Sequence, residues 1–279
     1  MKQTEFGEFD AIDERLLEMD KIWRKGYGVE IPPAAPQLVA RSHFYSNQSR
    51  ENWHSHSAAQ LLFCTQGVIR VLTPQASWTL GPMRAIWLPS DCQHELHALG
   101  DITTFSLYLD PHTASSLWLK CRTLQVSPLL NELIQALLVG QSATPPNAAR
   151  TALITPLLLD ELRQAQNSTV CNLPLPTDRR LRNICELMLA TPENNDTLEL
   201  WGNKVGASSR TLARLFREQT GLTFAQWRQQ LRLAEAVGQL AQGQTVMAIA
   251  NQLGYHSPSA FISMFKKSLG DTPQRYLRA

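Results

Sequence analysis

Apolar and polar residues follow three patterns along the chain, and the first is a series of short apolar runs. Between residues 37 and 110 turn residues separate the runs Gln60–Cys64, Val68–Leu72, Trp78–Leu80, Ala85–Leu88 and Thr103–Leu109. Runs of this length and spacing predict the strands of an antiparallel β-barrel or sandwich. We therefore expect a β-domain over residues 36–116. An N-terminal extension over residues 1–35, with a short amphipathic helix at Glu14–Trp23, is expected to precede it.

Helical periodicity replaces this pattern after residue 117. Leu129, Leu130, Leu133, Leu137 and Leu138 recur at the spacing of one helix face. Residues 151–166 predict a second helix, which Pro156 would kink or shorten, and the prolines within residues 167–177 predict a linker. We therefore expect a helical segment and linker over residues 117–177. The leucine stripe either packs on the β-domain or joins two subunits of a homodimer, and the sequence leaves both open.

Residues 178–279 predict only helices and contain an internal repeat with a shift of 49 residues. The first copy consists of Ser208, Leu212, Leu215, Phe216, Arg217, Gly221, Thr223 and Trp227, and the second of Ser257, Phe261, Met264, Phe265, Lys266, Gly270, Thr272 and Tyr276. Every spacing within the first copy is kept in the second. A repeat of this kind indicates duplicated structural units.

Each copy has the signals that begin, orient and end a helix. Ser208 and Ser257 are good N-caps, because a serine hydroxyl accepts a hydrogen bond from an amide of the first turn. The apolar residues of each copy lie at i, i+3 and i+4, so they form one buried stripe. Gly221 and Gly270 stand where a left-handed helix end is expected.

A shorter helix and a tight turn with glycine precede each copy. We expect the first short helix over Leu198–Val205, with Asp196 as its N-cap. The second is expected over Val246–Leu253, with Thr245 as its N-cap. A long helix over Phe224–Leu240 connects the two units. Helix, turn and helix is the layout of the helix-turn-helix motif, so the sequence predicts two such units in tandem.

The charge distribution along the chain indicates a nucleic-acid partner. Residues 178–279 hold 13 Lys and Arg against 8 Asp and Glu, a net charge of +5, whereas residues 1–177 have a net charge of −3. A basic domain on an acidic body fits a protein that holds nucleic acid at one end. The chain has no apolar run long enough for a membrane span and no signal-peptide core. Its five cysteines are scattered, which predicts free thiols in a cytoplasmic protein without membrane contact.

Candidate DNA-contacting side chains lie on the second helix of each unit. Arg210, Arg214 and Arg217 lie on the outward face of the first of these helices, and arginine binds guanine edges or phosphates in bidentate fashion. Ser209, Ser259 and Ser263 are small enough to let a helix approach base edges. Because the three arginines lie on a repeated helix-turn-helix unit, we expect them to bind double-stranded DNA rather than only to face solvent.

These motifs resemble those of the AraC/XylS family of bacterial regulators over about residues 179–278. The resemblance rests on residues 209–216, residues 249–255, residues 259–261 and residues 265–267. It implies that both second helices enter successive major-groove segments of promoter DNA. Arg210 and Arg214 match base-reading positions in the first unit, and Ser259 and Ser263 match those in the second. Arg217 and Lys266 complete the predicted DNA-binding set. The resemblance also implies a small-molecule effector and, for an activator, contact with RNA polymerase.

A histidine motif in the β-domain is the second candidate site. His54, His56 and Gln60 lie at i, i+2 and i+6, and His94 follows a Pro-x-Asp turn. This pattern resembles the two cupin motifs, in which such residues face into a barrel and bind metal. Gln60 replaces the acidic ligand, and Asp91 replaces the glycine of the turn. Three interpretations stay open: an effector pocket lined by Trp53, His54, His56, Gln60 and His94, structural hydrogen bonding, and a metal site.

The predicted fold class is α+β: an N-terminal cupin-like β-barrel, linker helices, and an all-α domain with two helix-turn-helix units over residues 178–279. We expect a DNA-binding transcription regulator controlled by an effector in the barrel, with no enzymatic activity and no resident cofactor. A metal-dependent cupin oxygenase or isomerase and an architectural DNA binder are the alternatives. The sequence has no nucleophile with a base at a recognised spacing and no phosphate-binding glycine loop.

Overall fold

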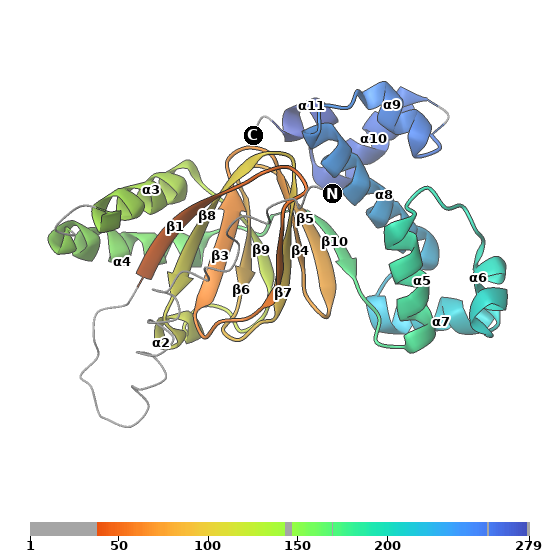
Figure 1. Cartoon of the computed structure of the whole chain (residues 1–279), viewed down its shortest axis with the longest axis horizontal. Coiled ribbons are helices and arrows are strands. Elements are labelled where there is room, and N and C mark those ends of the chain that lie inside the picture. The colour runs from red at the N-terminus through yellow and green to blue at the C-terminus, as the bar shows by residue number, and fades with distance from the viewer. Residues whose placement is uncertain (1–37, 143–146, 169, 256, 278–279) are drawn as a thin grey trace, which may run out of the picture.

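The computed structural model describes residues 38–142, 147–168, 170–255 and 257–277, so the predicted extension and its helix lie outside the described residues. The β-rich half contains β1 (Leu38–Tyr45), β2 (Arg50–His54), β3 (Ala59–Cys64), β4 (Val68–Leu72), β5 (Ala76–Leu80), β6 (Arg84–Leu88), β7 (His94–Leu99), β8 (Ile102–Leu109), α2 (Pro111–Ser115), β9 (Arg122–Gln125), α3 (Pro128–Ser142), α4 (Ala148–Gln164) and β10 (Cys171–Pro174). The helical half contains α5 (Arg179–Ala190), α6 (Leu198–Val205), α7 (Ser209–Thr220), α8 (Phe224–Ala241), α9 (Val246–Gln252), α10 (Pro258–Leu269) and α11 (Pro273–Tyr276). Figure 1 shows the two halves side by side, with α3 and α4 on the far side of the strands.

Two five-stranded antiparallel sheets build the β-domain. One has the order β1-β8-β3-β6-β9 and the other the order β10-β5-β4-β7-β2. Apolar side chains from both sheets, among them Leu62, Ile86, Val71 and Leu96, form a common buried core between them. The expected cupin-like β-domain is therefore confirmed as two packed sheets rather than as a closed barrel.

Alternating residues of β3 show how the first sheet is covered on both faces. Leu61 and Phe63 belong to a core shared with α3 and α4, whereas Leu62 belongs to the core between the sheets. Leu130 and Leu137 of the leucine stripe are buried in the core with α3 and α4, while Leu129 stays 46% exposed. The stripe thus packs largely on the sheet, which is one of the two roles that the sequence left open.

The structure corrects the expected organisation of residues 117–177. Strand β9 lies in this segment and pairs with β6, and β10 lies in the expected linker and pairs with β5. Strand β9 has a single fully buried residue, Leu124, so it shows no apolar alternation. Proline at the end of β10 is tolerated because β10 is an edge strand. The expected second helix is present as α4, which begins at Ala148 and runs through Pro156, so the proline neither shortens the helix nor moves its start inward.

Local signals in the helical half are confirmed, with one exception. Ser208 and Ser257 cap α7 and α10, and both helices end at left-handed glycines. Thr245 caps α9, as expected. The cap of α6 is Thr197 rather than Asp196, because the Thr197 hydroxyl accepts from the amide of Leu200. Asp196 is instead paired with Lys204, at 2.7 Å.

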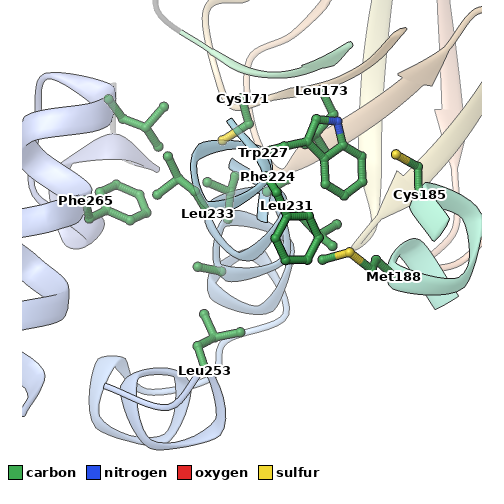
Figure 2. Close-up of a cluster of buried hydrophobic side chains, with 14 of the residues drawn as sticks. Cys171, Leu173, Cys185, Met188, Phe224, Trp227, Leu231, Leu233, Leu253 and Phe265 are labelled. Carbon is green, nitrogen blue, oxygen red and sulfur yellow. The ribbon is translucent and has the colours of Figure 1, made fainter. Parts of the chain in front are cut away.

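A single apolar core joins the helical half to the second sheet. It contains Trp227 and Leu231 of α8 together with Cys171 and Leu173 of β10. Figure 2 shows the α8 side chains between these strand residues and the neighbouring helices. The Trp227 indole N–H donates to the carbonyl of Pro174, at 2.8 Å. The expected linker is thus part of the packing between the two halves.

Candidate functional site

Helix α7 is fixed by its apolar face and presents its polar face to solvent. Leu212 and Phe216 are fully buried, as the repeated stripe predicted. Gly206 ends α6 in the left-handed region, at φ 68°, and the turn then brings the chain back over Gly202. The orientation of α7 is therefore set by backbone packing at this turn.

The structure brings the predicted DNA-contacting residues to the surfaces of two matching helices. Arg210, Arg214 and Arg217 are exposed on α7, and Ser259, Ser263 and Lys266 are exposed on α10. Ser209 is the exception, since it is half-buried at the start of α7. Helix α8 lies between the two units, as Figure 1 shows. This arrangement gives two exposed polar helix faces at the two ends of one buried helix.

Arg214 has an intramolecular partner that sequence analysis did not name. Its Nη1 atom lies 2.6 Å from Oε2 of Glu218, one helical turn further along α7. Both side chains are more than half exposed, so the ion pair is worth at most about 1 kcal/mol. The guanidinium can therefore exchange this partner for a base or a phosphate at little cost.

The predicted histidines meet inside the β-domain, although they come from different segments. His54 ends β2, His56 lies in the connection to β3, and His94 begins β7. One ring nitrogen from each lies within 4.8 Å of the others, and the His54 and His94 rings are 4.1 Å apart. We call His54, His56 and His94 the histidine cluster.

Backbone carbonyls fix the orientation of all three rings. The Nδ1 atoms of His54, His56 and His94 lie 2.7–2.8 Å from the carbonyl oxygens of Asn52, Ala58 and Cys92. A carbonyl only accepts hydrogen bonds, so each Nδ1 carries a proton, and in the neutral ring Nε2 then holds a lone pair. Burial lowers the pKa of His94 to about 3 and also lowers that of His56, so these two rings stay neutral.

The cluster has the donor atoms of a metal site but lacks an acidic ligand at residue 60. The Nε2 atom of His94 is buried and has no hydrogen-bond partner. Imidazole nitrogens suit first-row transition metals, and carbonyl-bonded Nδ1 atoms are typical of histidines that bind metal. His54, His56 and His94 would hold such an ion. Gln60 is 2% exposed and contributes no charge. The Oε1 atom of Glu51 lies 3.3 Å from His54 Nε2.

The structure changes the predicted membership of this site. Trp53 is 49% exposed, because neighbouring strand residues point to opposite faces and His54 points inward. Trp53 therefore does not belong with the cluster. Ser106 and Tyr108, which the sequence analysis missed, accept hydrogen bonds from the Gln60 amide at 3.0 and 3.2 Å. The pairing of β3 with β8 brings them there, and residue spacing carries no signal for that register.

A surface pocket lies elsewhere in the β-domain. It has a volume of about 560 Å³ and is lined by Pro74, Gln75, Ala76, Trp78, Pro89, Ser90, Asp91, Cys92, Gln93, Leu119, Lys120 and Cys121. None of the five residues predicted to line the effector pocket belongs to it. Asp91 adopts φ 59°, the left-handed turn conformation for which glycine is the usual residue.

Polar contacts connect the β-domain to α8 and α11. Arg70 of β4 and Glu235 of α8 form an ion pair at 2.6 Å, with both side chains largely buried. Arg84 lies over the ring of Tyr276, with 3.9 Å between the guanidinium carbon and the ring centre. Helix α8, which contacts the sheet through Glu235, also connects the two helix-turn-helix units.

Comparison with known proteins identifies both halves. Residues 36–168 match the family profile of the AraC-like ligand binding domain, and residues 201–279 match that of a helix-turn-helix domain. The HTH-type transcriptional regulator NimR of Escherichia coli (strain K12) is 37% identical over 224 residues, which cover 80% of this chain and 81% of NimR. The chain belongs to the AraC/XylS family of transcriptional regulators.

Other matches agree with this assignment. RipA of Corynebacterium glutamicum, also an HTH-type transcriptional regulator, is 31% identical over 103 residues, which cover 37% of this chain and 31% of RipA. Among solved structures, ToxT from Vibrio cholerae, bound to an unsaturated fatty acid, is 12% identical and covers 88% of this chain and 95% of ToxT. The TM-score of this match is 0.36.

Family membership confirms the function expected from the sequence. The chain is a DNA-binding transcription regulator with an N-terminal ligand-binding domain, and its relatives are regulators rather than enzymes. The matched ligand-binding domain reaches residue 168, so it includes α3 and α4. In the part of the chain that the structure describes, every helix is too short or too polar to span a lipid bilayer.

Proposed function

We propose that α7 and α10 enter two successive major-groove segments on one face of promoter DNA. Arg210 and Arg214 read bases through α7, while Ser259 and Ser263 let α10 approach base edges. Ser209 allows the same close approach at the start of α7, and Arg217 and Lys266 contact phosphates. The observation that carries this proposal is the pair of exposed polar faces on two helices whose apolar faces are fixed on one connecting helix.

The histidine cluster is the proposed effector site. The neutral ring of His94 offers a buried Nε2 lone pair that has no hydrogen-bond partner within the described residues. One ring nitrogen each of His54, His56 and His94 lies within 4.8 Å of the others. Such a site takes an electron-pair acceptor: a hydrogen-bond donor or a divalent transition-metal ion. The contacts of β4 and β7 with α8 then provide the route by which binding alters the DNA-binding units.

Further partners follow from this role. A protein that reads promoter DNA acts in the cytoplasm, and contacts RNA polymerase if it activates transcription. Homodimer formation would let two chains bind paired half-sites. The exposed residues of α3 and α4, including Leu129, Val139, Leu153 and Leu157, are the available apolar surface for such pairing.

The experiment that tests specific recognition is capture of genomic DNA fragments by the purified full-length protein, followed by sequencing. We expect enrichment of a few sites, each about two helical turns long. The genes beside them would indicate the class of effector. Even recovery of all fragments would contradict specific recognition and favour the architectural alternative.

Replacing Arg214 with alanine should weaken binding to an enriched site by about 1–3 kcal/mol, because a bidentate base contact is lost. Titration of labelled DNA at fixed salt measures the change. Arg163→Ala is the matched control, since it removes the same charge from an exposed position on α4. Equal affinities of both variants would exclude Arg214 from the reading set.

If the histidine cluster accepts a metal, excess Zn²⁺ should raise the melting temperature of the protein by about 5 °C. A Zn²⁺ concentration of about 100 times Kd raises the free energy of unfolding by about 2.7 kcal/mol. Thermal unfolding with and without the ion measures this. His94→Phe should abolish the shift, whereas His112→Phe, an exposed histidine on α2, should retain it. No shift in the unsubstituted protein would leave hydrogen-bond donors as the effector class.

A further inference from the structure

Two cysteines far apart in the sequence meet in the wall of the surface pocket of the β-domain. The Sγ atoms of Cys92 and Cys121 lie 3.7 Å apart, and both residues are partly exposed. Cys92 follows the turn after β6, and Cys121 precedes β9, so both lie outside regular strands. A disulfide bond is about 2.05 Å long, so the two sulfurs need to approach by only about 1.7 Å, within the range that side-chain rotation and small loop shifts provide.

The other three cysteines differ from this pair. Cys64, Cys171 and Cys185 are buried in apolar cores. Burial raises the pKa of Cys64 and of Cys171 to about 12, which keeps their thiols protonated and unreactive. The chain therefore contains one accessible thiol pair and three shielded thiols.

The pocket gives small molecules access to the pair. Both cysteines contribute to its wall together with Trp78, Pro89, Leu119 and Lys120. Its volume of about 560 Å³ is far larger than a peroxide molecule needs. The contact with the Cys121 thiol lowers the pKa of the Cys92 thiol, which favours the thiolate at Cys92.

The same pocket touches both functional parts of the protein. The carbonyl of Cys92 accepts the Nδ1 hydrogen bond of His94, at 2.8 Å. The opposite wall includes Pro74 and Gln75, whose carbonyls accept hydrogen bonds from Arg182 of α5 and from the amide of Leu175. The thiol pair thus lies between the histidine cluster and the segment that joins the two domains.

We propose that Cys92 and Cys121 form an oxidisable dithiol, a modification site that hydroperoxides convert into an intramolecular disulfide. The Cys92 thiolate attacks one peroxide oxygen, the O–O bond breaks, and Cys92 sulfenic acid and hydroxide form. The Cys121 sulfur then attacks the Cys92 sulfur, the S–OH bond breaks, and the released hydroxide takes the Cys121 proton to leave as water. The hydroxide formed in the first step takes up the proton that Cys92 released on forming its thiolate. Two thiols thus lose two electrons in total, and one hydrogen peroxide is reduced to two water molecules, or one organic hydroperoxide to an alcohol and one water.

The test is peptide mapping of the full-length protein after hydrogen peroxide treatment, with free thiols alkylated and no reductant added. Trypsin cleaves after Arg84, Lys120 and Arg122, so the disulfide would join peptide 85–120 to the dipeptide 121–122. We expect this cross-linked species to become the main form of both peptides. Two of the five thiols are expected to be lost, while Cys64, Cys171 and Cys185 stay available for alkylation after unfolding.

Variants separate the two steps. In the Cys121→Ser variant the oxidation is expected to stop at the Cys92 sulfenic acid, which dimedone labels. The Cys92→Ser variant is expected to form neither the sulfenic acid at residue 92 nor the disulfide. Cys64→Ser is the matched control and should still form the cross-link. The proposal is overturned if the unsubstituted protein keeps both Cys92 and Cys121 as thiols, or if peroxide joins peptide 85–120 to a second chain instead.

Discussion

Replacing Trp227 with alanine is expected to lower the free energy of unfolding by about 3–5 kcal/mol, the largest loss among the substitutions considered. Trp227 is fully buried in the core that joins α8 to β10, and its indole N–H donates to the Pro174 carbonyl. The substitution removes a large apolar surface and leaves that carbonyl without its donor. Denaturant unfolding followed by circular dichroism measures the loss.

Because this core contains residues of both domains, the loss should reach the β-domain as well. Trp227→Phe separates the two contributions, since it keeps most of the apolar contact and removes only the hydrogen bond. Trp53→Ala is the matched control: this tryptophan is 49% exposed, so its loss should change stability by less than about 0.5 kcal/mol. Equal stabilities of the Trp227→Ala and Trp53→Ala variants would contradict the packing of α8 against β10.

The helix-turn-helix units could be predicted because their signals are local. A serine cap, an apolar stripe and a terminal glycine follow one another within fourteen residues of each repeat copy, and all three appear in the structure as expected. The bounds of α6 match the prediction, although its cap does not. Thr197 and Asp196 are adjacent residues that can both cap a helix. In the structure Thr197 is the cap, while Asp196 is bonded to Lys204 and Asn194.

The β-domain site was only partly predictable, because its geometry depends on strand register. The three histidines were found from their motif, but Ser106 and Tyr108 reach Gln60 through the pairing of β3 with β8. Trp53 was misplaced for another reason, since side chains alternate along β2 and Trp53 points away from the face of His54. The contact of Cys92 with Cys121 joins two loop residues 29 positions apart, and residue spacing carries no signal for it. Alternation of residue types along one strand predicts which face of the sheet a side chain lies on. Its neighbour on the next strand depends on the register between strands, which only the folded sheet defines.

Strand β10 was missed because packing, not propensity, makes it a strand. Its four residues end in a proline and have only two buried side chains, Cys171 and Leu173. Both contact α8, so the segment is held between the sheet edge and a helix that lies more than fifty residues later in the chain. Sequence reasoning treats such a segment as a linker until the position of that helix is known.

Replacing Gly202 with alanine is expected to weaken binding to an enriched DNA site by about 100-fold, which corresponds to the loss of one or two base contacts. A Cβ atom on Gly202 would lie 2.4 Å from the carbonyl oxygen of Ala207 in the turn between α6 and α7. The contact is with backbone, so relief requires α6 and the turn to separate. Helix α7 would then move, and Arg210 and Arg214 would leave their reading positions.

Overpacking at this turn should also cost about 1–3 kcal/mol of stability, so DNA affinity is best measured at a temperature well below the unfolding transition. Gly140→Ala is the matched control. Gly140 lies inside α3, where a Cβ would meet only Thr151 Oγ1 at 4.0 Å. The Gly140→Ala substitution should raise the free energy of unfolding by about 0.5–1 kcal/mol, because alanine is a better helix former than glycine. Both variants add one methyl group to a helix. A lower DNA affinity of Gly202→Ala than of Gly140→Ala would therefore result from the close contact between α6 and the turn. Equal DNA affinities would show that the position of α7 does not depend on Gly202.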